Sequence, residues 1–230
     1  MLQRIHLPPH LDSTPIPTQV SAMVHDLRCR IETFQDRWDV EQIEQFVAAD
    51  YLLVYQTLAW LRGSQMMIGN RFLEWGCGFA AVTLIADSLG WDCIGVESES
   101  TLIGHGRKTV ADWCDMLRDE AAADPASHSA VDHPPARPPE LIRGNFLPGG
   151  ADRLADDPTL PSLGHDCEPV YRSLGLELDD FSVVYSYPWP GEDEFHESVF
   201  DRYAARGAVL VQFCGPNDVR AWRAVSRATS

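Results

Sequence analysis

Residues 71–97 read RFLEWGCGFAAVTLIADSLGWDCIGVE. Two short apolar runs flank a longer apolar segment, and glycine residues separate the three parts, a pattern typical of a strand, a helix and a second strand. We therefore expect a strand over 71–75, a helix over 80–89 and a strand over 92–96. A unit of this kind belongs to a parallel sheet that helices cover on both faces.

The alternation of strand and helix continues along the rest of the chain. The expected elements are a helix over 101–119, strands over 140–143, 181–185 and 208–213, a helix over 193–205 and one final helix. Right-handed crossovers place the strand-to-helix turns at one edge of such a sheet, and ligands bind beyond the carboxyl ends of the strands. The sequence therefore predicts a Rossmann-like α/β fold, a parallel sheet with helices on both faces, and a ligand site at that edge.

Composition divides the chain into two parts. Residues 1–39 begin with a stretch rich in proline and polar residues, and we expect an extended segment followed by a short helix. Residues 40–230 form a single predicted domain, which opens with an amphipathic helix over 40–61. Mobile loops are expected near 120–139 and 148–178, because neither stretch carries a sustained apolar period, and the second could hold a short helix around 170–174.

Charge and hydrophobicity limit the partners and the location of the protein. The chain carries 34 acidic and 18 basic side chains, a net charge of −16, which opposes a broad nucleic-acid-binding surface. It holds no apolar run of about 20 residues, the length that spans a bilayer, and its N-terminus lacks a secretory signal. We therefore expect a cytoplasmic protein without membrane contact. The six cysteines show no spacing typical of zinc ligands, and no metal site is predicted.

The first candidate binding element is the turn that contains Gly76 and Gly78. Two glycines let the backbone turn tightly and let a ligand approach it closely. Glu74 stands at the mouth of this turn, and its negative charge favours a cationic ligand and opposes a diphosphate. S-adenosylmethionine meets this requirement, because it carries a sulfonium and an ammonium group and no phosphate. We count Trp75, which lies in the same segment, among the cofactor-binding residues.

Two further strand ends supply candidate groups for the same ligand. Glu97 follows the second strand, where a carboxylate can accept hydrogen bonds from both hydroxyls of a ribose, and Ser98 comes next. Asn145 and Phe146 follow the third strand. The amide could bind an adenine edge and the ring could pack on the adenine face, although a simple turn explains the same two residues.

The segment after the fourth strand reads YSYPWPGE over residues 185–192. Two prolines around a tryptophan predict a stiff loop that could form the wall of a substrate pocket. We place Ser186 among the cofactor-binding residues and take Tyr187 and Glu192 as candidate catalytic residues, with Asp193 and His196 as further candidate bases. The alternative is a rigid turn whose aromatic side chains plug the sheet edge and whose acidic residues stabilise the start of a helix.

These features together resemble the class I S-adenosylmethionine-dependent methyltransferases over residues 71–213, with a further likeness to uncharacterised bacterial members. The family's first motif is an acidic residue followed by two glycines at alternate positions, which Glu74-Trp75-Gly76-Cys77-Gly78 matches. Glu97 matches the family's acidic residue after the second strand. Ala80 stands where a third glycine is frequent, and Asn145 stands where an aspartate is frequent.

The C-terminal part of the chain departs further from this family. Ser186-Tyr187-Pro188-Trp189 matches only in part the loop motif of the amino-methylating members, so the resemblance does not imply amino-group methylation. The chain is also short after residue 213 for the family's final antiparallel strand pair. The resemblance therefore implies a sheet that lacks this pair, with an open edge that could support a homodimer.

The sequence thus predicts an S-adenosylmethionine-dependent methyltransferase that acts on an unidentified small-molecule or protein substrate. A non-catalytic module that binds S-adenosylmethionine or a nucleoside is the first alternative, because no catalytic base is evident. An NAD-dependent oxidoreductase is the second. It would need a third glycine where Ala81 stands, and Glu74 would oppose its diphosphate.

Overall fold

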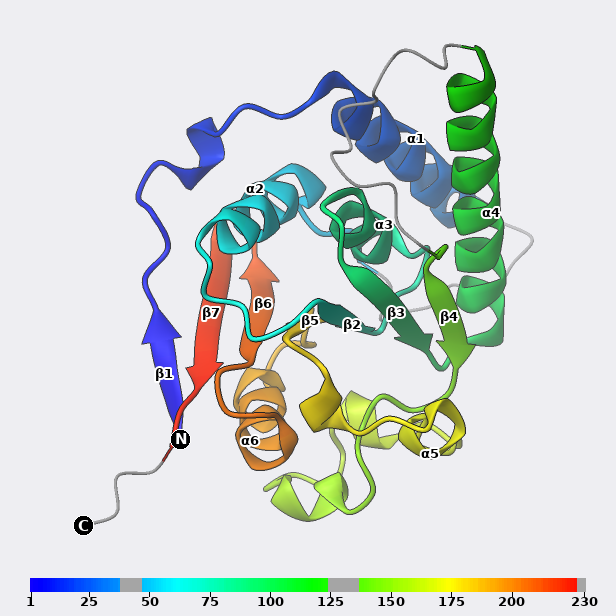
Figure 1. Cartoon of the computed structure of the whole chain (residues 1–230). Helices are drawn as coiled ribbons and strands as arrows, with labels where there is room; N and C mark the ends of the chain where they lie inside the picture. The colour runs from blue at the N-terminus through cyan, green and yellow to red at the C-terminus, as the bar shows by residue number, and fades with distance from the viewer. Residues whose placement is uncertain (38–46, 124–136, 227–230) are drawn as a thin grey trace.

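The computed structural model of the protein describes residues 1–37, 47–123 and 137–226. Within these residues, one seven-stranded sheet forms the centre of the molecule (Figure 1). Its strands are β1 (Leu2–Ile5), β2 (Arg71–Trp75), β3 (Asp92–Glu97), β4 (Glu140–Arg143), β5 (Val183–Ser186), β6 (Val209–Gly215) and β7 (Asp218–Ala224). They lie side by side in the order β1-β7-β6-β5-β2-β3-β4.

The five strands that the sequence predicts, β2 to β6, are all parallel to one another. β2 lies between β3 and β5, so that Trp75 is opposite Val96 on one side and Ser186 on the other. Because parallel strands point the same way, the carboxyl ends of β2, β3 and β5 meet at one edge of the sheet. The Rossmann-like α/β fold predicted from the sequence is confirmed.

The sequence pattern does not predict β1 and β7. β7 pairs antiparallel with β6, and β1 pairs antiparallel with β7 at the edge of the sheet. The predicted final helix is wrong, because Asn217, with a φ of +62°, turns the chain back so that Asp218–Ala224 pairs with β6. The prediction that the sheet lacks the family's final antiparallel strand pair is wrong in part. One antiparallel strand does follow β6, and the N-terminus supplies the outermost strand.

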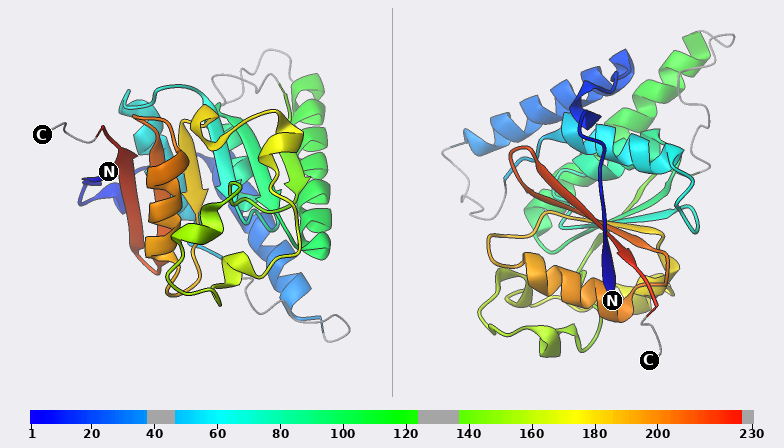
Figure 2. Two further views of the ribbon diagram at one scale, coloured as in Figure 1. Left: turned by 90° about the horizontal axis from the view of Figure 1, so that it is seen from below. Right: turned by 90° about the vertical axis from the view of Figure 1, so that its left-hand side faces the viewer.

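Helices cover both faces of the sheet, as Figure 2 shows. The helices are α1 (Thr18–Gln35), α2 (Tyr51–Gly63), α3 (Ala81–Ser88), α4 (Ser100–Ala123), α5 (Tyr171–Leu174) and α6 (Asp193–Tyr203). The short 3-10 helices are η1 (Leu11–Ser13), η2 (Ala151–Leu154), η3 (Pro161–Leu163) and η4 (Leu178–Asp180). The first four α-helices lie on one face, and α5 and α6 lie on the other.

Alternate side chains of each strand point into two separate hydrophobic cores. In β2, Phe72 packs into the core under α1 to α4, whereas Leu73 and Trp75 pack into the core under α5 and α6. Glu74 shares the face of Phe72, and it contacts Thr83 of α3. The strand period therefore turns this carboxylate toward the start of the following helix.

The N-terminal helices differ from their predicted bounds. The helix predicted over 40–61 begins only at Tyr51, because the Asp50 side chain accepts hydrogen bonds from the Leu52 and Leu53 amides, at 3.2 and 3.3 Å, and caps it there. The predicted start of this helix falls in residues 38–46, outside the described residues. Residues 1–39 hold an 18-residue helix, α1, rather than a short one, because its apolar face packs against α3.

The two predicted loops contain regular structure at several points. Residues 120–123 continue α4, and residues 124–136 lie outside the described residues. The segment 148–178 holds η2, η3 and α5, and α5 confirms the short helix expected around 170–174. Among the described residues, no helix combines the length and the apolar character that a membrane crossing requires.

Candidate functional site

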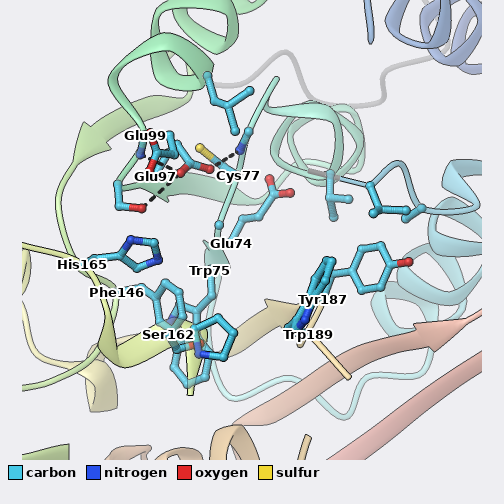
Figure 3. A pocket seen from close by; sticks show the side chains of 18 of the residues that line it. Glu74, Trp75, Cys77, Glu97, Glu99, Phe146, Ser162, His165, Tyr187 and Trp189 are labelled. Carbon is cyan, nitrogen blue, oxygen red and sulfur yellow. Dashed lines mark hydrogen bonds between the residues drawn. The ribbon is translucent and has the colours of Figure 1, made fainter. Parts of the chain in front are cut away.

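A cavity of about 790 Å³ opens at the carboxyl ends of β2, β3 and β5, the sheet edge where the sequence predicts a ligand site. The turn after β2, the end of β3, the loop after β5 and the segment 159–165 form its walls (Figure 3). Tyr51, at the start of α2, also lines it. The cavity thus gathers side chains from segments that are far apart in the sequence.

The turn after β2 depends on its glycines. Gly76 has a φ of +72° and Gly78 a φ of +49°, values that residues other than glycine rarely adopt. Apart from its two chain neighbours, no described residue has an atom within 4 Å of the position that a Cβ on Gly76 would occupy, so the backbone there borders open space. Cys77 between them is buried, and burial raises the pKa of its thiol well above the usual value. Cys77 is therefore a packing residue and not a nucleophile.

Glu97 connects the end of β3 to the glycine turn. Its Oε2 accepts a hydrogen bond from the Gly78 amide at 2.9 Å, and its Oε1 accepts one from the Glu99 amide at 2.9 Å and one from the Ser98 hydroxyl at 3.4 Å. Burial raises the pKa of Glu97, and the hydrogen bonds from the amides oppose this rise. The protein thus fixes both oxygens of a carboxylate that lines the cavity.

Glu74 also serves the protein itself. Its Oε2 accepts hydrogen bonds from the Thr83 amide at 2.6 Å and from the Thr83 hydroxyl, and so satisfies the first turn of α3. The N-cap residue of this helix, Ala80, offers no side-chain acceptor. Burial raises the pKa of Glu74 to about 8, the Thr83 bonds oppose this, and Glu97 adds to the rise. A cation in the cavity would stabilise the charged form of this carboxyl.

The charged residues of the cavity are nearly all acidic. Four of the described residues that line it are glutamates, namely Glu74, Glu97, Glu99 and Glu192. No lysine or arginine occurs among the described lining residues. A phosphate group entering this space would meet four carboxyl groups and no fixed cation. The cavity therefore suits a ligand that is cationic or neutral and carries no phosphate.

Aromatic side chains form two opposite walls of the cavity. Trp75 and Phe146 stack on each other with ring centroids 5.1 Å apart and an interplanar angle of 16°. Tyr187 and Trp189, from the loop after β5, lie on the other side (Figure 3). Flat, partly apolar surfaces of this kind pack well against a planar ring.

A network of buried polar side chains adjoins the aromatic wall. His196 Nδ1 lies 2.6 Å from Ser186 Oγ, and His196 Nε2 lies 3.0 Å from Ser162 Oγ. The Ser162 amide donates to Glu192 Oε1 at 2.7 Å. Burial lowers the pKa of His196 to about 3, so the imidazole is neutral at physiological pH. Asp193 opposes this shift.

Most of the predicted site residues share the cavity, and Asn145, Ser186 and Asp193 do not. The predicted residues that line it are Glu74, Trp75, Gly76, Gly78, Glu97, Ser98, Phe146, Tyr187, Glu192 and His196. Asn145 is absent from the lining, because its Oδ1 accepts a hydrogen bond from the Leu147 amide at 2.8 Å and closes a local turn. Ser186 is fully buried, and its hydroxyl lies 2.6 Å from Nδ1 of His196, which does line the cavity. Ligand binding by Asn145 and Ser186 therefore stays a prediction. Asp193 accepts a hydrogen bond from Arg220 at 3.1 Å.

Sequence reasoning missed several residues of the site. Ser162 and His165 line the cavity, but they belong to a segment with no periodic pattern and no motif, so no local signal marks them. Glu99 lies close behind Glu97 and could have been found as a second acid at the same strand end. His165 lies in the same cavity as Glu97, a proximity that depends wholly on the folded chain.

No protein-family model and no curated protein sequence matches the chain. Its fold is similar to solved structures of methyltransferases at low identity. A methyltransferase from Podospora anserina, solved with S-adenosylhomocysteine, gives a TM-score of 0.48 at 11% identity, covering 88% of this chain and 65% of that chain. An O-methyltransferase from Bacillus cereus, also solved with S-adenosylhomocysteine, gives 0.45 at 12% identity, with 88% and 70% covered. An RNA methyltransferase from Salinibacter ruber gives 0.43 at 14%, with 77% and 94% covered. The chain thus spans about two thirds of the length of the first of these proteins.

Proposed function

We propose that this protein binds S-adenosylmethionine in the acidic cavity and transfers its methyl group to a small-molecule or protein acceptor. One observation carries the proposal. The cavity at the carboxyl edge of the sheet presents four glutamates and, among its described lining residues, no lysine or arginine. An adenosyl cofactor with a sulfonium and an ammonium group complements this charge, whereas a dinucleotide with its diphosphate is repelled.

The residues present fit each part of this cofactor. Glu97, fixed by the Gly78 and Glu99 amides, is the acceptor for the two ribose hydroxyls. Glu74 is the counter-charge for the cationic methionine part, and the open backbone at Gly76 leaves room for it. The Trp75 and Phe146 rings provide an apolar surface for the adenine.

When bound, the cofactor supplies an electrophilic methyl group on a positively charged sulfur. The chain then has to align the acceptor with this methyl and exclude water, since methyl transfer depends on in-line orientation. The loop with Tyr187 and Trp189 provides a stiff wall for that purpose, because prolines stand on both sides of the tryptophan. Tyr187 and Glu192, which both line the cavity, are the candidates for contact with the acceptor.

A non-catalytic S-adenosylmethionine-binding module is the second candidate function. It is favoured by the hydrogen bonds that already occupy Glu74 and Glu192, since both carboxylates then have structural roles. The two candidates share the cofactor site and differ only in the transfer step. The NAD-dependent alternative is disfavoured by the same four glutamates that support the proposal.

Calorimetry with the purified protein tests the cofactor site. S-adenosylhomocysteine should bind, and NAD should not. Glu97→Ala should weaken binding by more than tenfold, because a buried charged acceptor for the ribose is lost. Glu97→Gln keeps one oxygen for the Gly78 amide and should give an intermediate loss. Glu140→Gln, which removes one exposed charge at the start of β4, is the matched control and should bind as the wild type does.

Equal affinity of the wild type and Glu97→Ala would rule out the ribose contact. NAD binding of similar strength would overturn the cofactor assignment itself. Labelled methyl transfer to fractions of a cell extract then separates an enzyme from a binding module, because a module leaves the label on the cofactor.

A further inference from the structure

Four polar side chains form a network at the cavity wall that the proposed cofactor contacts leave unused. They are Ser162, Ser186, Glu192 and His196, with exposed fractions of 5%, 0%, 2% and 3%. They come from η3, from the end of β5 and from the start of α6, and three of them line the cavity. Burying polar groups is costly unless they are paired, so this concentration of them next to a ligand cavity points to a function.

His196 is held at the centre of this network. Its two ring nitrogens lie 2.6 Å from Ser186 Oγ and 3.0 Å from Ser162 Oγ. Trp75 and Phe146 meet the imidazole edge-on, at centroid distances of 5.4 and 5.5 Å. Hydrogen bonds at both nitrogens and rings on two sides fix the plane of the imidazole.

Glu192 connects to the same network at two points. Its Oε1 accepts a hydrogen bond from the Ser162 amide at 2.7 Å, and its Oε2 lies 4.0 Å from His196 Nε2. The first contact positions Ser162, and the second places a carboxylate beside the imidazole. Glu192 therefore lies where it would stabilise a positive charge on His196.

The arrangement defines a path for a proton. With its proton on Nδ1, the imidazole donates to Ser186, and Nε2 accepts from the Ser162 hydroxyl. The oxygen lone pairs of Ser162 then remain available to a donor inside the cavity. A hydroxyl group of a bound molecule is a donor of the required kind.

We propose that Ser162, His196 and Glu192 form a proton relay for a methyl acceptor that carries a hydroxyl group, an inference that rests on the proposed function. The acceptor gives its proton to Ser162 Oγ while Ser162 passes its own proton to His196 Nε2. The acceptor oxygen uses the freed electron pair for the new O–C bond, and the S–C bond breaks with its pair left on sulfur. Glu192 stabilises the imidazolium, which releases its proton to water after the product leaves.

A weakly basic imidazole is sufficient for this step, because the acceptor proton becomes strongly acidic as the O–C bond forms. A neutral amine differs, since its methylated product can keep the proton as an ammonium ion and needs no relay. The network therefore favours an alcohol or a phenol. The acidic lining of the cavity further indicates that this acceptor carries no phosphate.

The experiment starts with binding of S-adenosylhomocysteine, which tests the cofactor site alone. Labelled S-adenosylmethionine is then incubated with the protein and the small-molecule fraction of a cell extract, and the products are sorted into ethers, esters and amines. Methyl ethers, which are stable to base, are expected. Lack of binding would overturn the proposed function and the relay together. Binding without transfer, or label found only in amines or esters, would overturn the relay and leave the cofactor site intact.

Variants test the individual groups. Ser162→Ala and His196→Asn should each lower the transfer rate at least 100-fold while the Kd for S-adenosylhomocysteine stays within threefold, which also shows that they fold. Ser162→Thr keeps the hydroxyl and should restore a tenth or more of the rate. Ser88→Ala is the matched control, because this hydroxyl donates to the Ile85 carbonyl within α3 and does not belong to the cavity lining. Unchanged rates in the first two variants would overturn the relay.

Nitrogen NMR of the His196 ring adds a readout that does not depend on transfer. The relay requires a neutral imidazole with its proton on Nδ1 at pH 7, and Ser162→Ala should shift the Nε2 resonance alone. A proton found on Nε2 in the wild type would contradict the relay, whatever the activity of the protein.

Discussion

Ligand binding at Glu74 should release a proton. Burial raises the pKa of this carboxyl to about 8 in the ligand-free protein, so at pH 7 about nine molecules in ten carry it protonated. A cationic ligand beside it favours the charged form and must displace that proton. Binding of S-adenosylmethionine at pH 7 should therefore release close to one proton from the protein.

This linkage fixes how affinity depends on pH. Only the deprotonated carboxyl attracts the cation, so the Kd should fall about tenfold for each unit of rising pH below 8 and level off above it. Between pH 6 and 8 the affinity should rise by about fiftyfold. Glu97, Tyr51, Cys77 and Tyr185 face the same space, and burial raises the pKa of each of them as well. Of these four groups, Glu97 is the one whose titration can add to the slope.

Calorimetry in two buffers of different ionisation enthalpy measures the released proton directly. Glu74→Gln is the matched variant, since its amide oxygen can still accept from Thr83 while the titrating group is gone. It should bind more weakly at pH 8, release no proton from this position and lose most of the pH slope. The reasoning would be refuted by zero proton release in the wild type, or by a slope that Glu74→Gln leaves intact.

Two predictions concern stability. Asp87 is buried with one carboxyl oxygen lacking a partner among the described residues, and burial raises its pKa to about 7. Since its folded pKa exceeds its unfolded value, stability should decline as pH rises from about 4 to 7, by at most about 4 kcal/mol, and Asp87→Asn should remove this part in urea titrations at pH 5 and 8. A Cβ on Gly95 would lie 2.8 Å from Leu141 and 2.9 Å from Cys77, so Gly95→Ala should cost about 1–3 kcal/mol of unfolding free energy. An unchanged urea midpoint for Gly95→Ala would contradict this prediction, because it would show that Leu141 and Cys77 move aside without cost.

The sequence alone identified the central part of the fold. The apolar runs of β2 and β3, with the glycine turn between them, predict a parallel unit because each local pattern fits only one arrangement. Parallel strands then place Glu74 and Glu97 at one edge, since their positions follow from strand order and direction and from no long-range contact. The acidic character of the cavity was also visible in advance.

Tertiary structure decided the remainder. β7 reads as the start of a helix in sequence, and only its pairing with β6 and β1 makes it a strand, because a short segment takes its conformation from its neighbours. Ser162 and His165 reach the cavity through a long segment without a motif, and Asn145 turns its amide to a neighbouring backbone instead. The network around His196 joins η3, β5 and α6, and such non-local contacts leave no trace in the local pattern of residues.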